Sequence, residues 1–296
     1  MSERGRIERT TVLVVGLQLA AYWPVWHWYW LRLAGGGGDE AWGPLALLTA
    51  IIAFALPATH SAGRAREVAA EDETQDARLD GGSGGGRIPL LWPTVLVLIY
   101  AATYPVLPPL GRACVAFAGL GCTLSLWRFG RAFDPATLGL LWLSLPLVPS
   151  LQFYGGYPLR ALVAQASAPL LRLGGLVVVP EGACLRWGEQ LIWIDAPCSG
   201  VRMLWAGMFL ACLLACVFRL SRRQTLFLFG LALVSIIAGN VWRALALFYL
   251  EAGIYEPPFA WAHGGVGVAA FALVGVGVVA AARRLRGSRR EVRWTD

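Results

Sequence analysis

Apolar segments that can cross or nearly cross a bilayer recur along almost the whole chain. A straight transmembrane helix needs roughly 20 apolar residues, and several of the eight candidate segments are shorter than that. The candidates cover residues 11–33, 42–57, 88–107, 110–126, 138–151, 201–218, 225–250 and 266–282. This pattern predicts an all-α polytopic membrane protein with about eight transmembrane helices in a single integral-membrane domain, residues 1–296.

The composition is that of a membrane protein. Hydrophobic residues make up 57% of the chain and charged residues 15%, whereas soluble domains carry about 25% charged residues. The 14 tryptophans fit an aromatic belt at the membrane interface. The cysteines and histidines show no metal-binding spacing, and no phosphate-binding loop is present. We therefore expect no metal, no cofactor and no nucleic-acid partner.

The positions of the arginines predict the orientation in the membrane, because basic residues favour the cytoplasmic side. All 25 basic residues are arginine. With the N-terminus inside, 18 arginines fall on the cytoplasmic side and five outside, while Arg202 and Arg243 lie within apolar segments. We therefore expect cytoplasmic termini, a flexible cytoplasmic loop at residues 59–87 and a cytoplasmic arginine-rich tail at residues 283–296.

The longest predicted outer loop, residues 152–197, has the pattern of a small extracytoplasmic cap. Apolar residues recur at helical spacing over residues 159–173, which indicates an interfacial amphipathic helix. Residues 176–180 and 184–194 then read as two short strands joined by a turn at Glu181-Gly182. The cap is thus expected to place an amphipathic helix and a strand pair before the sixth transmembrane helix.

The turn Pro197-Cys198-Ser199-Gly200-Val201-Arg202 leads directly from this cap into the apolar segment 201–218. A helix N-terminus and a nearby cation both favour the reactive thiolate form of cysteine. Ser199 can cap a helix that starts there, and Gly200 permits close backbone approach. Arg202 lies one turn beyond Cys198, where it can assist the chemistry, clamp a substrate or form a structural ion pair.

Segment parity brings two further polar groups to the same depth as Cys198. Asn240 and Arg243 share one face of the seventh segment because they are three residues apart. Arg243 lies about 10 Å below the outer end of that helix, at 1.5 Å rise per residue. His263 precedes the eighth segment, which also begins outside. A thiol, a guanidinium and an imidazole should therefore all lie near the outer membrane boundary.

These three groups form a coherent set for acyl transfer. His263 can accept the thiol proton and return it to a leaving amine. Arg243 does not readily lose its proton, so it suits stabilisation of an oxyanion or of a substrate carboxylate. The implied reaction passes through a thioester on Cys198.

The same residues resemble the exosortase/archaeosortase family of membrane-embedded sorting enzymes, over roughly residues 88–282. The matching motifs are Cys198-Ser199-Gly200 at a helix start, Asn240-x-x-Arg243, and His263 near the next outer boundary. The resemblance implies that Cys198, Arg243 and His263 are catalytic. The histidine at the third position is similar to the bacterial exosortase branch.

The resemblance also implies a substrate class. Such enzymes cleave exported, membrane-tethered proteins near a C-terminal tripartite signal, which consists of a short motif often built around Pro-Glu-Pro, a transmembrane helix and an arginine-rich end. They are thought to pass the protein to an acceptor nucleophile, which the sequence does not identify. The implied location is the bacterial cytoplasmic membrane, with the active site on the extracytoplasmic side.

Simpler interpretations stay open at this point. Cys198 can form a disulfide with Cys184 or be a packing residue, and His263 can be an ordinary interface histidine. Arg243 can be a structurally paired arginine with one of three acidic partners, Asp195, Glu251 or Glu256. A polytopic transporter or a structural scaffold, with an incidental outer-face Cys/Arg/His set, is the alternative function.

Overall fold

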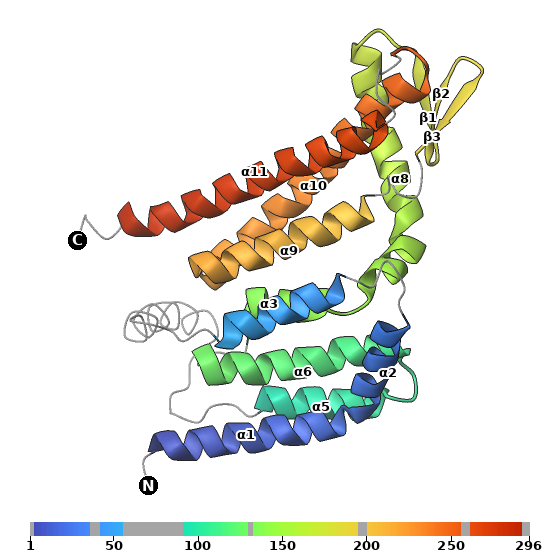
Figure 1. The fold of residues 1–296 in the computed structure, drawn as a ribbon. Helices are drawn as coiled ribbons and strands as arrows, with labels where there is room; N and C mark the ends of the chain where they lie inside the picture. The colour runs from blue at the N-terminus through green and yellow to red at the C-terminus, as the bar shows by residue number, and fades with distance from the viewer. Residues whose placement is uncertain are drawn as a thin grey trace. The chain divides into compact units, whose positions relative to one another are not determined.

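The protein folds mainly into helices, with one small sheet (Figure 1). The computed structural model describes residues 3–35, 42–55, 91–129, 133–194, 200–255 and 261–291. The predicted flexible loop at residues 59–87 lies outside this part of the chain, as does the end of the arginine-rich tail. The chain divides into two compact units, Met1–Leu145 and Pro146–Asp296, which are described separately.

The first unit contains six described helices, of which four pack against α6 (Pro109–Phe129) or α7 (Pro135–Leu143). Polar contacts join distant segments in its interior: the Thr123 hydroxyl donates to Gln18 Oε1 at 2.9 Å, and the Tyr29 hydroxyl donates to the Ser144 carbonyl at 2.9 Å. The other helices are α1 (Glu3–Ala21), α2 (Trp23–Ala34), α3 (Gly43–Ala55) and α5 (Leu91–Thr103).

The predicted first span, residues 11–33, is not one helix. It is divided between α1 and α2, which meet at the fully buried Tyr22. Pro24 occupies the first turn of α2, a position that proline favours because the amide there has no helical partner. The ring of Tyr22 packs against Tyr100 of α5 with centroids 4.8 Å apart. The apolar pattern thus located the segment but did not reveal the break.

The second unit is built around α10 (Arg222–Glu251), which packs against α8 (Leu147–Leu173), α9 (Val201–Phe218) and α11 (Ala262–Glu291). The predicted sixth, seventh and eighth segments correspond to α9, α10 and α11. Ser221 caps α10 by accepting from the Gln224 amide, and the Gln224 side chain accepts from the Ser221 amide. This reciprocal pair is a capping box, and it fixes where α10 begins.

Three antiparallel strands lie between α8 and α9 in sequence, in the order β1-β2-β3. The strands are β1 (Val178–Glu181), β2 (Cys184–Trp187) and β3 (Gln190–Trp193). The predicted pair was therefore incomplete, because residues 184–194 form a hairpin rather than one strand. Gly182 and Gly188 begin the two-residue turns, with φ of 59° and 58°. Glycine adopts this conformation without a steric cost, which makes such tight hairpins possible.

The predicted boundary between the fifth span, residues 138–151, and the cap also differs from the structure. The helix α7 ends at Leu143 and α8 begins at Leu147, with Pro146 at its N-cap. The expected amphipathic helix at residues 159–173 is the C-terminal part of the 27-residue α8. Proline limits helical continuation through the residue that precedes it, which places the break before residue 147 rather than after residue 151.

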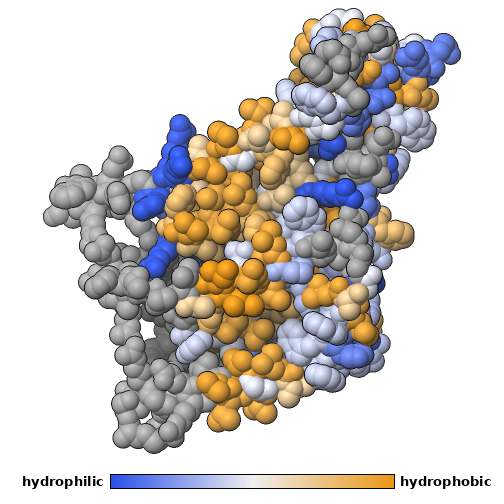
Figure 2. Space-filling model, viewed as in Figure 1, coloured by the Kyte–Doolittle hydropathy of each residue, from blue (hydrophilic) through white to orange (hydrophobic). Residues whose placement is uncertain are grey.

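In the described part of the chain, four helices are long and apolar enough to cross a membrane. Apolar side chains cover the middle of the helices, and hydrophilic ones gather toward their ends (Figure 2). The count becomes five if α7 and α8 form one broken span. The four are Pro109–Trp127, Val201–Phe218, Arg222–Glu251 and Ala262–Arg286, and three shorter apolar helices are Val12–Ala21, Gly43–Ala55 and Pro93–Thr103.

Replacing Gly239 by alanine should destabilise the second unit. A Cβ atom at this position would lie 2.5 Å from Val274 Cγ2 of α11 and 2.7 Å from Met203 Cε of α9. Overpacking of this kind costs about 1–3 kcal/mol, so the thermal unfolding midpoint in detergent should fall. Gly230→Ala on the same helix is the control, because a Cβ atom there meets nothing within 4 Å. Equal midpoints for the two variants would contradict this packing.

Candidate active site

The candidate site lies where α9 begins, α10 ends and α11 begins. These three helix ends lie at the same end of the second unit, beside the small sheet (Figure 1). The helices also pack against one another along their lengths. The start of α9 and side chains near the end of α10 and the start of α11 therefore share one region of the second unit.

Cys198 and Ser199 lie outside the described residues, but the chain on both sides of their turn is held in place. On the N-terminal side, the Ile194 amide donates to the Ala183 carbonyl at 3.0 Å, and the Ile194 carbonyl accepts from Arg160 Nη1 at 3.5 Å. On the C-terminal side, the Gly200 carbonyl accepts from the Leu204 amide at 2.7 Å. The five residues between Ile194 and Gly200 thus connect two fixed points.

Gly200 is the N-cap of α9, which begins at Val201. The helix therefore starts where the predicted segment 201–218 begins, and its N-cap is Gly200 rather than Ser199. The φ angle of Gly200 is 81°, in the left-handed region that glycine tolerates and other residues rarely enter. Cys198 precedes the helix by three residues and does not sit in its first turn.

Asn240 explains why this position has no side chain. Only 4% of Asn240 is exposed, and a Cβ atom at Gly200 would lie 2.8 Å from Asn240 Nδ2. The amide of Asn240 therefore packs directly against the backbone at the start of α9. The spacing pattern predicted both residues near the site, and the structure brings them together.

Arg243 extends from α10 toward α11. A Cβ atom at Gly267 would lie 3.4 Å from Arg243 Cζ and 3.5 Å from its Nε and Nη2. Gly267 is one turn beyond His263 on α11, and residues four apart lie on the same helix face. The guanidinium is thus partly buried against the face of α11 that carries His263, so the predicted convergence of the arginine and the histidine has a structural basis.

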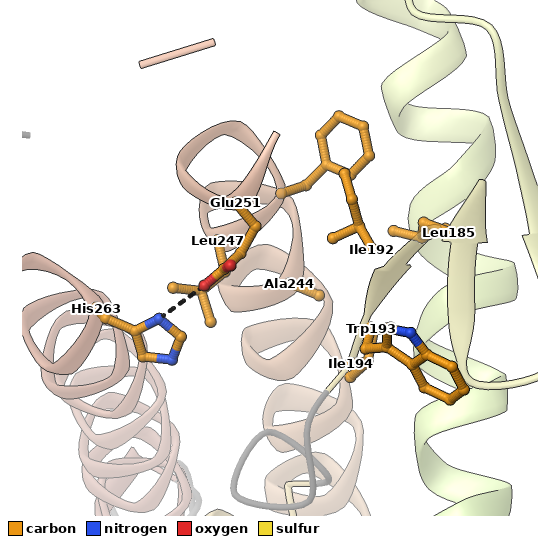
Figure 3. A pocket seen from close by; sticks show the side chains of 9 residues that line it. Leu185, Ile192, Trp193, Ile194, Ala244, Leu247, Glu251 and His263 are labelled. Carbon is orange, nitrogen blue, oxygen red and sulfur yellow. Dashed lines mark ion pairs between the residues drawn. The ribbon is translucent and has the colours of Figure 1, made fainter. Parts of the chain in front are cut away.

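His263 lies in the first turn of α11 and contacts Glu251, the last residue of α10. The distance from His263 Nδ1 to Glu251 Oε1 is 3.4 Å, and the two side chains are 46% and 53% exposed (Figure 3). From the sequence, we expected Glu251 only as a possible partner for Arg243. The structure pairs it with the histidine instead, which leaves Nε2 of His263 on the opposite side of the ring.

A comparison with protein-family models gives a match over residues 19–280 to a family described as transmembrane exosortase. The chain belongs to the transmembrane exosortase family. No curated protein and no solved structure matches it. The match confirms the resemblance inferred from the motifs around Cys198, Asn240 and His263. Exosortases are membrane peptidases and transpeptidases that act on sorting signals, so family membership indicates a multi-pass membrane protein that takes part in protein sorting.

Arg202 is the most exposed arginine among the predicted site residues of this exosortase. It is the second residue of α9, and its side chain is exposed. Arg243, in contrast, is fixed between α10 and α11. Within the described residues, no group of three or more His, Cys, Asp or Glu side chains can hold a metal ion.

Cys184 of the exosortase has the environment of a structural cysteine. It lies in β2, is 4% exposed and carries a free thiol. Burial raises the pKa of the Cys184 thiol; the Glu181 carboxylate raises it further, while Arg160 lowers it. A buried thiol with a raised pKa is a poor nucleophile. Four other cysteines lie within helices of the two units: Cys114, Cys122, Cys212 and Cys216.

Proposed function

We propose that this exosortase is a membrane-embedded cysteine protease and transpeptidase that cleaves a C-terminal tripartite sorting signal of exported proteins. The signal consists of a short motif, a transmembrane helix and an arginine-rich end. The reaction passes through a thioester on Cys198, and water or an acceptor nucleophile then releases the product. The contact of Arg243 with the His263-bearing face of α11 is the observation that carries the proposal.

The proposed setting is the bacterial cytoplasmic membrane, crossed about eight times. The four long apolar helices, the broken pair α7–α8 and the three shorter apolar helices support this number. Both termini are cytoplasmic in this arrangement, and residues 152–197 form the extracytoplasmic cap. The start of α9, the end of α10 and the start of α11 then face the outside, where an exported substrate arrives.

Cys198, Arg243 and His263 divide the chemistry among them. The Cys198 sulfur attacks the carbonyl carbon of the scissile peptide bond, and Arg243 stabilises the resulting oxyanion. His263 takes the thiol proton and gives it to the leaving nitrogen as the carbon–nitrogen bond breaks. The thioester then reacts with water or an acceptor amine, which restores the thiol.

Four further residues support this chemistry. Asn240 packs against Gly200 and so fixes the backbone two residues after the nucleophile. Ser199 lies between Cys198 and Gly200 in sequence and is proposed as a supporting residue. Arg202 lies exposed at the start of α9, and its guanidinium is proposed to bind an anionic group of the substrate.

Glu251 acts as a positioning residue for His263 in this proposal. A carboxylate at Nδ1 fixes the ring orientation and directs Nε2 toward the reaction, as in other cysteine and serine peptidases. Such a pair at 46% and 53% exposure contributes little to stability. Its value is therefore in the orientation of the imidazole rather than in folding.

Single replacement of Cys198, Arg243 or His263 by alanine should abolish or strongly reduce processing of a co-expressed reporter that ends in motif, helix and arginines. We expect background cleavage for Cys198→Ala and losses of about 100-fold or more for the other two, from lost charge stabilisation and proton transfer. Immunoblotting of precursor and product gives the ratio.

Cys184→Ala is the matched control and should retain processing, because that thiol is buried and structural. Cleavage of the reporter by Cys198→Ala would contradict the nucleophile assignment. Loss of transport of a solute without any change in reporter cleavage would favour the transporter alternative.

Glu251→Ala should lower the turnover rate on a synthetic sorting-signal peptide about 10- to 100-fold, because the imidazole loses its orientation. KM should change less than twofold, since Glu251 orients the histidine and does not bind the peptide. Glu251→Asp should restore part of the rate. Purified full-length protein in proteoliposomes supplies both constants.

The control is Glu181→Ala, which removes a carboxylate of similar exposure that pairs with Arg186 at 2.6 Å. It should leave turnover unchanged. An equal decrease in turnover for Glu181→Ala and Glu251→Ala would show that the histidine contact has no specific role.

A further inference from the structure

A small pocket opens beside the His263–Glu251 pair (Figure 3). Its walls come from two elements: the hairpin β2–β3 on one side and the last two turns of α10 on the other. All the wall side chains are apolar or aromatic, and His263 and Glu251 are the ionisable groups among the described lining residues. The wall residues are Leu185, Ile192, Trp193, Ile194, Ala244, Leu247 and Phe248.

The pocket is held open by packing behind its walls. Leu185, Ile192, Leu247 and Phe248 belong to the hydrophobic core that joins the sheet to α8 and α10. Leu185 and Phe248 are each 1% exposed, so their backbones are fixed by contacts on the far side of the pocket. Walls built in this way are largely preformed, which reduces the entropy that binding must overcome.

Three lining residues link the pocket to the proposed catalytic residues. His263 is part of its lining, Ala244 follows Arg243 on α10, and Ile194 is four residues before Cys198. A peptide bond oriented by His263 can therefore place a neighbouring side chain in this pocket. The lining offers this side chain mainly apolar contact, with the His263–Glu251 pair as its ionisable groups.

We propose that this pocket binds an apolar side chain of the peptide substrate next to the scissile bond, and so contributes to sequence specificity. This inference rests on the proposed function. An acidic side chain would lose its hydration against these apolar walls. It would also be repelled by Glu251. A leucine-sized side chain gains the burial of its apolar surface.

Trp193 is the residue that tests the proposal with the least risk to the fold. It forms part of the pocket wall but is 66% exposed, so its removal should not disturb the core. Leu191 of the same strand is 46% exposed and does not line the pocket. Trp193→Ala and Leu191→Ala are therefore a matched pair, and Trp193→Phe retains an aromatic wall.

The probes are synthetic sorting-signal peptides that carry leucine, alanine or aspartate at each position flanking the cleaved bond. With full-length protein in proteoliposomes, we expect wild type to prefer leucine at one of these positions. Trp193→Ala should lower kcat/KM for that leucine peptide about tenfold relative to the alanine peptide, a typical effect of changing one apolar contact in a pocket. Leu191→Ala and Trp193→Phe should keep the preference.

Two results would overturn the pocket assignment. One is a wild-type enzyme that shows no apolar preference at any flanking position. The other is a Trp193→Ala variant that changes cleavage of leucine and alanine peptides equally, as expected if the pocket binds lipid or is structural. Neither result affects the proposed function, which fails instead if Cys198→Ala cleaves these peptides.

Discussion

The close approach of α10 to α9 and α11 at glycine positions is the constraint on which the candidate site depends. Near the site, Asn240 occupies the space that a side chain at Gly200 would need, and Arg243 lies against Gly267. Without a hydrophobic driving force between helices in lipid, membrane helices rely on small residues for close packing. Here the same small residues also admit an amide and a guanidinium into the helix interfaces.

This arrangement reconciles polar groups with a membrane helix. Asn240 and Arg243 are costly in hydrocarbon, and such residues usually face the interior of a bundle. Both extend toward neighbouring helices, and the polar end of the bundle is continued by the His263–Glu251 pair. Arg243 and the face of α11 that carries His263 are thus brought together laterally.

Much of the second unit could be predicted from the sequence. The segment 201–218 coincides with α9, because a long apolar run and a preceding glycine turn leave few alternatives. The predicted start of α9 at residue 201 agrees with the structure, in which Gly200 is the N-cap. Segment parity placed Arg243 and His263 at one depth; that they also lie side by side was a further assumption, and the packing of Arg243 against Gly267 supports it. The structure of Cys198 itself lies outside the described residues.

Other features depend on contacts that a linear pattern does not encode. The break at Tyr22 within a continuous apolar run follows from tertiary packing around that ring. The third strand depends on Gly188. This residue falls within a predicted strand, but in the structure it begins the turn between β2 and β3. The contact of Glu251 with His263 joins two helix ends eleven residues apart in sequence, so it depends on the route of the intervening loop. The sequence signal that could have predicted this contact was an acidic residue at the end of one helix, Glu251, followed by a histidine at the start of the next helix, His263.

The most direct test of the central proposal is identification of the covalent intermediate. Full-length protein should be mixed with a sorting-signal peptide, quenched in acid within a single turnover, digested and analysed by mass spectrometry. The proposed mechanism predicts the N-terminal peptide fragment attached as a hydroxylamine-sensitive thioester to Cys198. Attachment to another residue, or product formation in a single turnover without any adduct on Cys198, would contradict it.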